Sequence, residues 1–302
     1  MAGNSKVAIY GAIFANLGIA IMKWVAAFYT GSAAMISEGI HSFVDSFNGI
    51  LLLYGIKRSQ QKPDARHPFG YGKEVYFWAF VVAVFIFALG GGIAIYEGIN
   101  HVMHPHAPEP GTMIWSYSVL IGAMVLESIS FWLAFREFRK TMNGGIIKSL
   151  RESKDAATFA VLLEDSAALV GLVIALIGIT LADYYENPII DGVTSICIGV
   201  LLALVAVFLA RETKGLLLGE SATDANVADI DAILVKRPSV MKWGEIRTMH
   251  LGPNTVLLAL NIDFANQLDV HTVETEIQAI EQEIMALHPH ISKIYIETTD
   301  LS

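Results

Sequence analysis

The residues that most clearly indicate chemistry lie in the apolar stretch from Gly31 to Ile56, where His41 and Asp45 are four positions apart. On a helix, residues i and i+4 share one face, with Cβ atoms roughly 5–6 Å apart. An imidazole and a carboxylate so placed can hold one divalent cation between them. Because ionisable groups at membrane depth are costly and usually mark a pathway or a site, this pair predicts a cation site. The alternative is a polar seam in which His41 is hydrogen-bonded to a neighbouring helix.

A second apolar stretch, from Ala156 to Leu181, carries the adjacent carboxylates Glu164 and Asp165. Neighbouring residues on a helix point about 100° apart, so at most one of the two aims squarely at a given partner. A carboxylate buried there needs a bound cation or an exchanging proton to compensate its charge. With His41 and Asp45, the two stretches offer one imidazole and up to three carboxylates. Such a set suits tetrahedral Zn²⁺, and Mn²⁺, Fe²⁺, Co²⁺ or Cd²⁺ would also accept it.

The composition predicts that these stretches are helices in a membrane. Hydrophobic residues make up 54% of the 302 residues and charged residues only 16%, against about 25% charged in a soluble domain. A helix needs roughly 20 apolar residues to cross a bilayer. Six segments have that length: Val7–Tyr29, Ala33–Ile56, Val75–Ile99, Met113–Phe135, Ala156–Leu181 and Pro188–Ala210.

Lys and Arg are concentrated in residues 57–73, in residues 136–154 and directly after the sixth segment. The other three connections, around Thr30 and in residues 101–111 and 183–187, contain neither residue type. The positive-inside rule therefore predicts that both termini are cytoplasmic. The N-terminal segment has the pattern of a helix start and not of a signal peptide, and its shortness favours a bacterial inner membrane.

The chain after Gly219 has the composition of a water-facing domain. From residue 221 to 302 there are 12 acidic and 5 basic side chains, a net charge of −7, which argues against nucleic acid and anionic lipid as partners. We expect a transmembrane domain over residues 1–215 and a cytoplasmic domain over residues 216–302. The periodicity predicts a ferredoxin-like α+β order, α-β-β-α-β, whose open face or edges could pair two copies. Its segments are Asp224–Lys236, Trp243–Leu251, Thr255–Phe264, Val270–Leu287 and Ile291–Glu297.

Several classes of protein are disfavoured by what the sequence lacks. The one cysteine, Cys197, allows neither an intramolecular disulfide nor a thiolate metal cluster. Neither the phosphate-binding pattern G-x-x-x-x-G-K-[ST] nor the metalloprotease pattern H-E-x-x-H occurs, so we expect an ion-driven transporter and not an enzyme. A proton-coupled organic-solute transporter and a non-transporting metal-binding scaffold remain alternatives.

Some polar residues have simpler interpretations. Lys23 is expected to extend toward a membrane interface. The run Gly90–Gly92 is expected to permit close helix packing. The position of Asp191 near the start of the sixth segment favours a structural role for this residue. The alternative is that it lines an outer vestibule. The histidines of the connection after the third segment are expected to be solvated side chains, with metal capture as the lesser alternative: His101, His104 and His106.

The motifs GSAAMISEGIHSFVDS, PDARHPFGYGKE and VLLEDSAALVG make the chain resemble the cation diffusion facilitator family, in particular the branch that contains zinc transporter nine. The resemblance implies a homodimeric metal/proton antiporter that exports divalent cations, with two ligands from the second helix and two from the fifth. His41, Asp45 and Asp165 match three of these positions. Val161 stands at the fourth, which leaves Glu164, Asn48, Ser37 or water as the last ligand, with Glu164 favoured.

The resemblance also implies further metal sites that this chain has largely lost. The loop after the second segment keeps Asp64 and His67, but Tyr71 replaces the last histidine, so a structural loop is the better interpretation. In the cytoplasmic domain the matching positions retain only His271 and Glu297, with Gly244, Ala259 and Thr299 at the others. We therefore expect no strong binuclear zinc site there.

Overall fold

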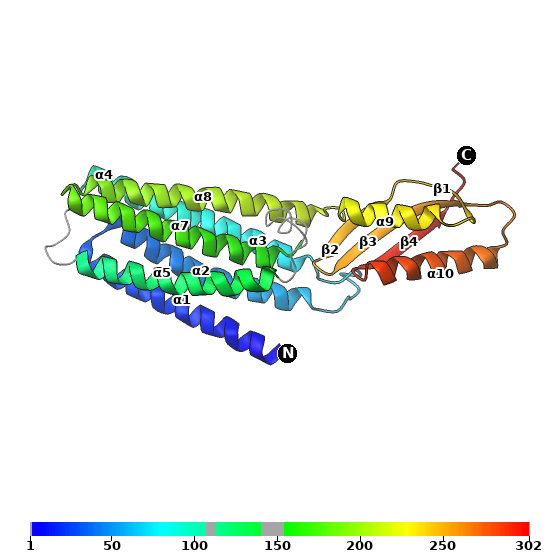
Figure 1. Ribbon diagram of the computed structural model, residues 1–302, viewed down its shortest axis with the longest axis horizontal. Helices are drawn as coiled ribbons and strands as arrows, with labels where there is room; N and C mark the ends of the chain where they lie inside the picture. The colour runs from blue at the N-terminus through cyan, green and yellow to red at the C-terminus, as the bar shows by residue number, and fades with distance from the viewer. Residues whose placement is uncertain (1, 107–112, 140–153, 302) are drawn as a thin grey trace.

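The computed structural model describes residues 2–106, 113–139 and 154–301, without the side chains of residues 2–15 and 137 (Figure 1). Lys140, Lys148 and Arg151, which the positive-inside argument counts, lie outside these residues. A long helical bundle makes up one end of the molecule and a small α+β unit the other. The bundle consists of α1 (Ala2–Thr30), α2 (Ala33–Ser59), α3 (Glu74–Phe85), a π-helical segment η1 (Ile86–Gly92), α4 (Ile93–Met103), α5 (Met113–Arg139), α7 (Ala156–Tyr184) and α8 (Ile189–Leu218).

Each of the six predicted apolar segments forms a helix. Because α3, η1 and α4 are continuous, they make one rod of 30 residues, Glu74–Met103. Within the described residues, four helices are long and apolar enough to cross a membrane: Glu74–Met103, Met113–Arg136, Ala156–Tyr184 and Ile189–Leu218. The first two helices, α1 and α2, pack against each other, and α2 also packs against α3, α7 and α8.

Glycine allows the backbones of the third rod and α8 to touch. A Cβ placed on Gly98 would lie 2.7 Å from the carbonyl oxygen of Gly192, and one on Gly199 would lie 2.9 Å from that of Gly91. Gly91 lies in the predicted Gly90–Gly92 run, so the packing interpretation of that run is confirmed. The close approach also brings the hydroxyl of Ser195 on α8 to 2.8 Å from the carbonyl oxygen of Ala94, to which it donates a hydrogen bond.

The α+β unit contains α9 (Asp224–Val235), β1 (Val240–Trp243), β2 (Arg247–Gly252), β3 (Thr255–Phe264), α10 (Val270–Leu287) and β4 (Ile291–Thr298). β3 pairs antiparallel with both β1 and β2 and parallel with β4, so the sheet is mixed. β1 faces residues 262–264 of β3 and β2 faces residues 255–259. Because β4 pairs with residues 256–262 of β3, β1 and β2 must share the opposite edge.

The single strand predicted over Trp243–Leu251 is therefore wrong in detail, because two short strands follow that edge. The break contains Gly244, a residue type that weakens strand interiors and often marks irregular positions. Gly244 still donates to the carbonyl oxygen of Asn261 at 2.9 Å, which keeps the two parts aligned. Side chains of β3 alternate between buried and half-buried, and the buried ones, such as Leu258 and Leu260, share a core with Ile230 of α9 and Ile280 of α10.

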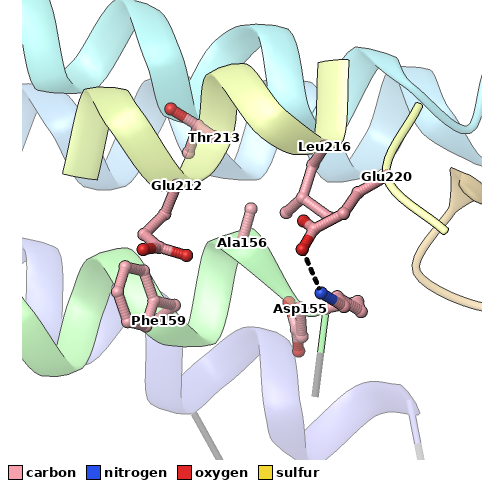
Figure 2. Close-up of a pocket in the computed structure, with 8 residues that line it drawn as sticks. Asp155, Ala156, Phe159, Glu212, Thr213, Leu216 and Glu220 are labelled. Atoms are coloured by element: carbon pink, nitrogen blue, oxygen red, sulfur yellow. Dashed lines mark hydrogen bonds and ion pairs between the residues drawn. The ribbon is translucent and has the colours of Figure 1, made fainter. Parts of the chain in front are cut away.

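The α+β unit joins the bundle through a few specific contacts. Lys73 Nζ, at the start of α3, lies 3.9 Å from the sulfur of Met249 on β2. Lys154, just before α7, pairs with Glu220 at 2.7 Å beside a small pocket between α7 and α8 (Figure 2). That pocket has a volume of about 20 Å³, which is room for about one water molecule. It is too small for an organic substrate.

Candidate functional site

The predicted His41–Asp45 pair is present near the middle of α2. His41 Nδ1 lies 3.4 Å from Asp45 Oδ1, and the two side chains are 2% and 11% exposed. Both ring nitrogens of His41 and Asp45 Oδ1 have no hydrogen-bond partner among the residues that the structure describes. Buried polar atoms are normally hydrogen-bonded, so these unpaired atoms are the feature expected of groups that bind a cation or a proton.

The position of α2 is fixed at its N-terminus by α8. The Ser32 hydroxyl accepts from Met35 N at 3.2 Å and donates to Asp191 Oδ1 at 2.8 Å. Asp191 Oδ2 also accepts from Ala33 N at 2.5 Å. A carboxylate at a helix N-terminus satisfies otherwise unpaired N–H groups and complements the helix dipole. The structural role predicted for Asp191 is thereby confirmed.

The two carboxylates of α7 point toward different neighbours. Glu164, which is 6% exposed, accepts a hydrogen bond of 2.8 Å from Asn48 Nδ2 on α2. Asp165 accepts from the Ser130 hydroxyl on α5, and its Oδ2 has no hydrogen-bond partner among the described residues. Both carboxylates are close enough to Asp45 to interact with it electrostatically. The two side chains therefore diverge as expected, and Glu164 is the carboxylate that faces α2.

The structure brings these side chains onto facing helices without closing them around one point. Within the described residues, no group of three or more His, Cys, Asp or Glu side chains is arranged to hold a metal ion. The fourth family position, Val161, is 37% exposed, and its apolar side chain offers no ligand. Ser37, another possible ligand, is paired with Ser195 on α8 at 2.5 Å between hydroxyl oxygens. The ligand set itself stays a prediction.

One prediction about a buried charge is wrong. Lys23 is fully buried and does not extend to an interface; its Nζ donates to Glu38 at 2.9 Å and to Ser42 at 2.8 Å. The physical reason is that Glu38 on α2 supplies a counter-charge at the same depth. Sequence reasoning missed Glu38. The signal that could have found it is its place in the sequence, three residues before His41. Glu127 on α5, 3% exposed, adds another carboxylate near this pair.

The loop after α2 has the structural role that its sequence predicted. Asp64 accepts from the backbone N–H groups of Arg66 and His67 at 2.9 and 2.7 Å, and from the Tyr71 hydroxyl at 2.7 Å. The hydrogen bond from Tyr71, followed by the one from His67, lowers the pKa of Asp64 below its usual 3.8. Tyr71 thus satisfies a carboxylate at the place where a third metal ligand would otherwise stand.

Comparison with known proteins agrees with this arrangement. Residues 9–218 match the family model described as the cation efflux transmembrane domain. The mitochondrial proton-coupled zinc antiporter SLC30A9 of Homo sapiens is 35% identical over 245 residues, which cover 80% of this chain and 43% of the relative. Metal tolerance protein C4 of Arabidopsis thaliana is 30% identical over 270 residues, covering 88% of this chain and 59% of the relative.

A bacterial relative is more distant but matches over most of its length. The cation-efflux pump FieF of Pectobacterium carotovorum is 24% identical over 275 residues, 89% of this chain and 84% of the pump. By contrast, the chain spans less than half of the length of the mitochondrial relatives that it matches.

Proposed function

The chain belongs to the cation efflux family, whose members are transporters and not enzymes, and from this membership we propose that it exports a divalent metal cation in exchange for protons. The observation that carries the proposal is the contact between His41 and Asp45 at 3.4 Å, buried in α2 and facing α7. Zn²⁺ is the first candidate because the human relative is named a proton-coupled zinc antiporter. The nitrogen and oxygen ligands would also accept Mn²⁺, Fe²⁺, Co²⁺ or Cd²⁺.

In the proposed mechanism, His41, Asp45 and Asp165 bind the metal, and Glu164 supplies the fourth ligand after releasing Asn48. Metal and protons compete for the same lone pairs, since a ligand must be deprotonated to bind. Transport then requires a conformational change that draws α2 and α7 together around the ion and opens the site to the other side. The uncompensated buried atoms of His41, Asp45 and Asp165 support this competition.

We propose further that all six helical rods of the bundle cross the membrane and that both termini are cytoplasmic. Four rods are long and apolar enough to cross a membrane by length and composition. The helix α2 carries the polar site residues, which reduce its hydropathy. The Lys and Arg pattern of the connections supports the orientation. A bacterial inner membrane stays the predicted location, which localisation of a fluorescently tagged chain in membrane fractions would test.

A homodimer is the assembly that we propose. The face of the sheet opposite α9 and α10 carries half-buried Leu257 and Ala259, and Tyr295 beside Ala259 is 55% exposed. A second copy could cover this apolar face. Tyr295→Asp is then expected to shift detergent-solubilised protein from dimer to monomer in light scattering coupled to chromatography, and an unchanged mass would contradict this interface.

The test of transport is Zn²⁺ flux into proteoliposomes under an imposed pH gradient, with wild type compared with Asp45→Asn and Asp165→Asn. We expect gradient-dependent flux that falls at least tenfold in each variant. Normal flux in both variants would place the site elsewhere. If the wild type moves neither Zn²⁺, Mn²⁺ nor Fe²⁺, the proposal of an antiporter is wrong.

The alternative with a specific observation in its favour is a metal-binding membrane scaffold. Val161 removes one family ligand, and its side chain is 37% exposed. Stoichiometric Zn²⁺ binding to the purified protein without flux would favour the scaffold. An organic-solute transporter would instead show flux that does not depend on metal.

A further inference from the structure

The bundle has a cavity at the end away from the α+β unit, where α1 meets α2, α4 ends and α7 meets α8. Its volume is about 460 Å³, far larger than the pocket of Figure 2. The ionisable residues among those that line it are two histidines and three acids, with no Lys or Arg in the described lining: His101, His106, Asp183, Glu186 and Asp191. We call this cavity the outer vestibule. Its ionisable groups favour a cation.

Two of these residues are nearly buried. His101 is 9% and Asp191 6% exposed, and His101 Nε2 lies 3.8 Å from Asp191 Oδ2. That separation is too long for a hydrogen bond, and within the described residues no hydrogen bond reaches the His101 ring. The ring therefore has unused nitrogen atoms in the wall of a cavity. Two ligands of one Zn²⁺ ion, each about 2.0–2.1 Å from it, stand roughly 3.3 Å apart in a tetrahedral site.

The neighbouring histidines behave differently from each other. The ring centroid of His106 lies 6.4 Å from that of His101, and both line the vestibule. His104, from the same connection, is exposed and is not among the lining residues. The sequence-based interpretation as solvated side chains therefore holds for His104 and His106, which are both exposed, and is wrong for the buried His101. His106 nevertheless shares the wall of the vestibule with His101.

The helix α2 connects the vestibule with the transport residues. Ser32, which lines the vestibule, is nine residues before His41, which is about 13 Å along α2 at 1.5 Å per residue. Between them, the hydroxyls of Ser37 and Ser195 lie 2.5 Å apart, and both residues are fully buried. One buried polar pair thus lies between the vestibule and the His41–Asp45 pair, at the contact of α2 with α8.

We propose that the outer vestibule is a second binding station for a divalent metal ion, which the ion occupies after it leaves the transport residues. His101 and His106 supply nitrogen ligands, and Asp191 and Asp183 supply negative charge. Because no three described side chains are arranged to enclose a bare ion, water completes the coordination. The direction of passage rests on the proposed function; metal binding in the vestibule does not.

The test measures Zn²⁺ binding to the full-length protein in detergent by titration calorimetry at pH 7. An Asp45→Asn/Asp165→Asn background weakens the transport site, so the remaining binding reports other sites. In that background we expect saturable binding that weakens at least tenfold when His101→Ala and His106→Ala are added together. His104→Ala, in the same connection but outside the lining, is expected to leave it unchanged.

Further variants separate the loss of a metal ligand from the loss of the fold. Because His101 lies beside the aspartate that caps α2, His106→Ala alone and His101→Gln are measured as well, each with a thermal melt to show that the fold persists. Zn²⁺ binding that is insensitive to all of these variants, or no saturable binding in the background, overturns the proposal. Zn²⁺ flux in wild-type proteoliposomes is measured separately. Failure of the vestibule proposal is therefore distinguished from failure of the proposed antiport.

Discussion

Lys23 on α1 and Glu38 on α2 form an ion pair of 2.9 Å in which both side chains are fully buried. Removing one partner of such a pair leaves an uncompensated buried charge, which typically costs about 3–5 kcal/mol. Lys23→Met is therefore expected to lower the thermal unfolding temperature of the detergent-solubilised protein. Lys23→Met/Glu38→Met, which removes both charges, is expected to regain most of the loss. A double variant as unstable as the single one would show that packing, not charge, dominates.

Substitutions at Val161 and Glu164 test which face of α7 binds metal. Because the Val161 side chain is 37% exposed and lies outside the buried group of site residues, Val161→His is expected to leave the affinity for Zn²⁺ within about twofold of wild type, and Val161→Leu is expected to do the same. Glu164→Gln, which changes the carboxylate that contacts Asn48, is expected to weaken binding at least tenfold. Titration calorimetry measures both. A large gain of affinity in Val161→His would mean that α7 turns this position inward when metal binds.

The Asp64 loop gives a prediction with a definite pH dependence. Since hydrogen bonding lowers the pKa of Asp64 below its usual 3.8 in the folded protein, the loop gains stability above that value and loses it as pH falls through the lowered pKa. Tyr71→Phe removes the hydrogen bond that contributes most to this lowering and is expected to raise the pKa of Asp64. Carboxyl chemical shifts in a pH titration measure it, and an unchanged Asp64 titration would show that the backbone N–H groups suffice.

The same loop is one substitution away from three metal ligands. Asp64 and His67 lie 3.4 Å apart between Oδ1 and Nδ1, and Tyr71 contacts both through its hydroxyl and ring. Tyr71→His is expected to add one Cd²⁺ or Zn²⁺ binding event per chain at micromolar concentrations, whereas Tyr71→Phe adds none. Equal stoichiometry in the two variants would contradict this expectation.

Packing of the third rod on α8 sets a limit on side-chain size. A Cβ on Gly98 would lie 2.7 Å from the Gly192 carbonyl oxygen and 2.8 Å from Ile196 N, both backbone atoms. Gly98→Val is therefore expected to destabilise the protein by about 1–3 kcal/mol, the usual range for an overpacked core. Gly122→Val on α5 is the matched control, because nothing lies within 4 Å of its Cβ position. Thermal melts of both variants compare them.

Local sequence patterns were sufficient for most of the secondary structure and for the pairs within one helix. Helical periodicity placed His41 and Asp45 on one face of α2, and alternating residues identified β3 and β4, because these arrangements depend only on the geometry of the local backbone. The interruption between β1 and β2 was not predictable in this way. It depends on pairing with β3, which the chain reaches only several residues later.

The sequence by itself determined that this protein has long apolar helices, an acidic α+β tail and an imidazole–carboxylate pair in α2, since composition and spacing of 3.6 residues per turn are properties of the chain alone. Only the tertiary structure decided that Glu164 faces α2 while Asp165 turns toward α5, and that Lys23 is neutralised by Glu38. It also separated His101, beside Asp191, from exposed His104. The direction of a side chain around a helix has meaning only once the neighbouring helices are placed, and those contacts join residues far apart in the sequence.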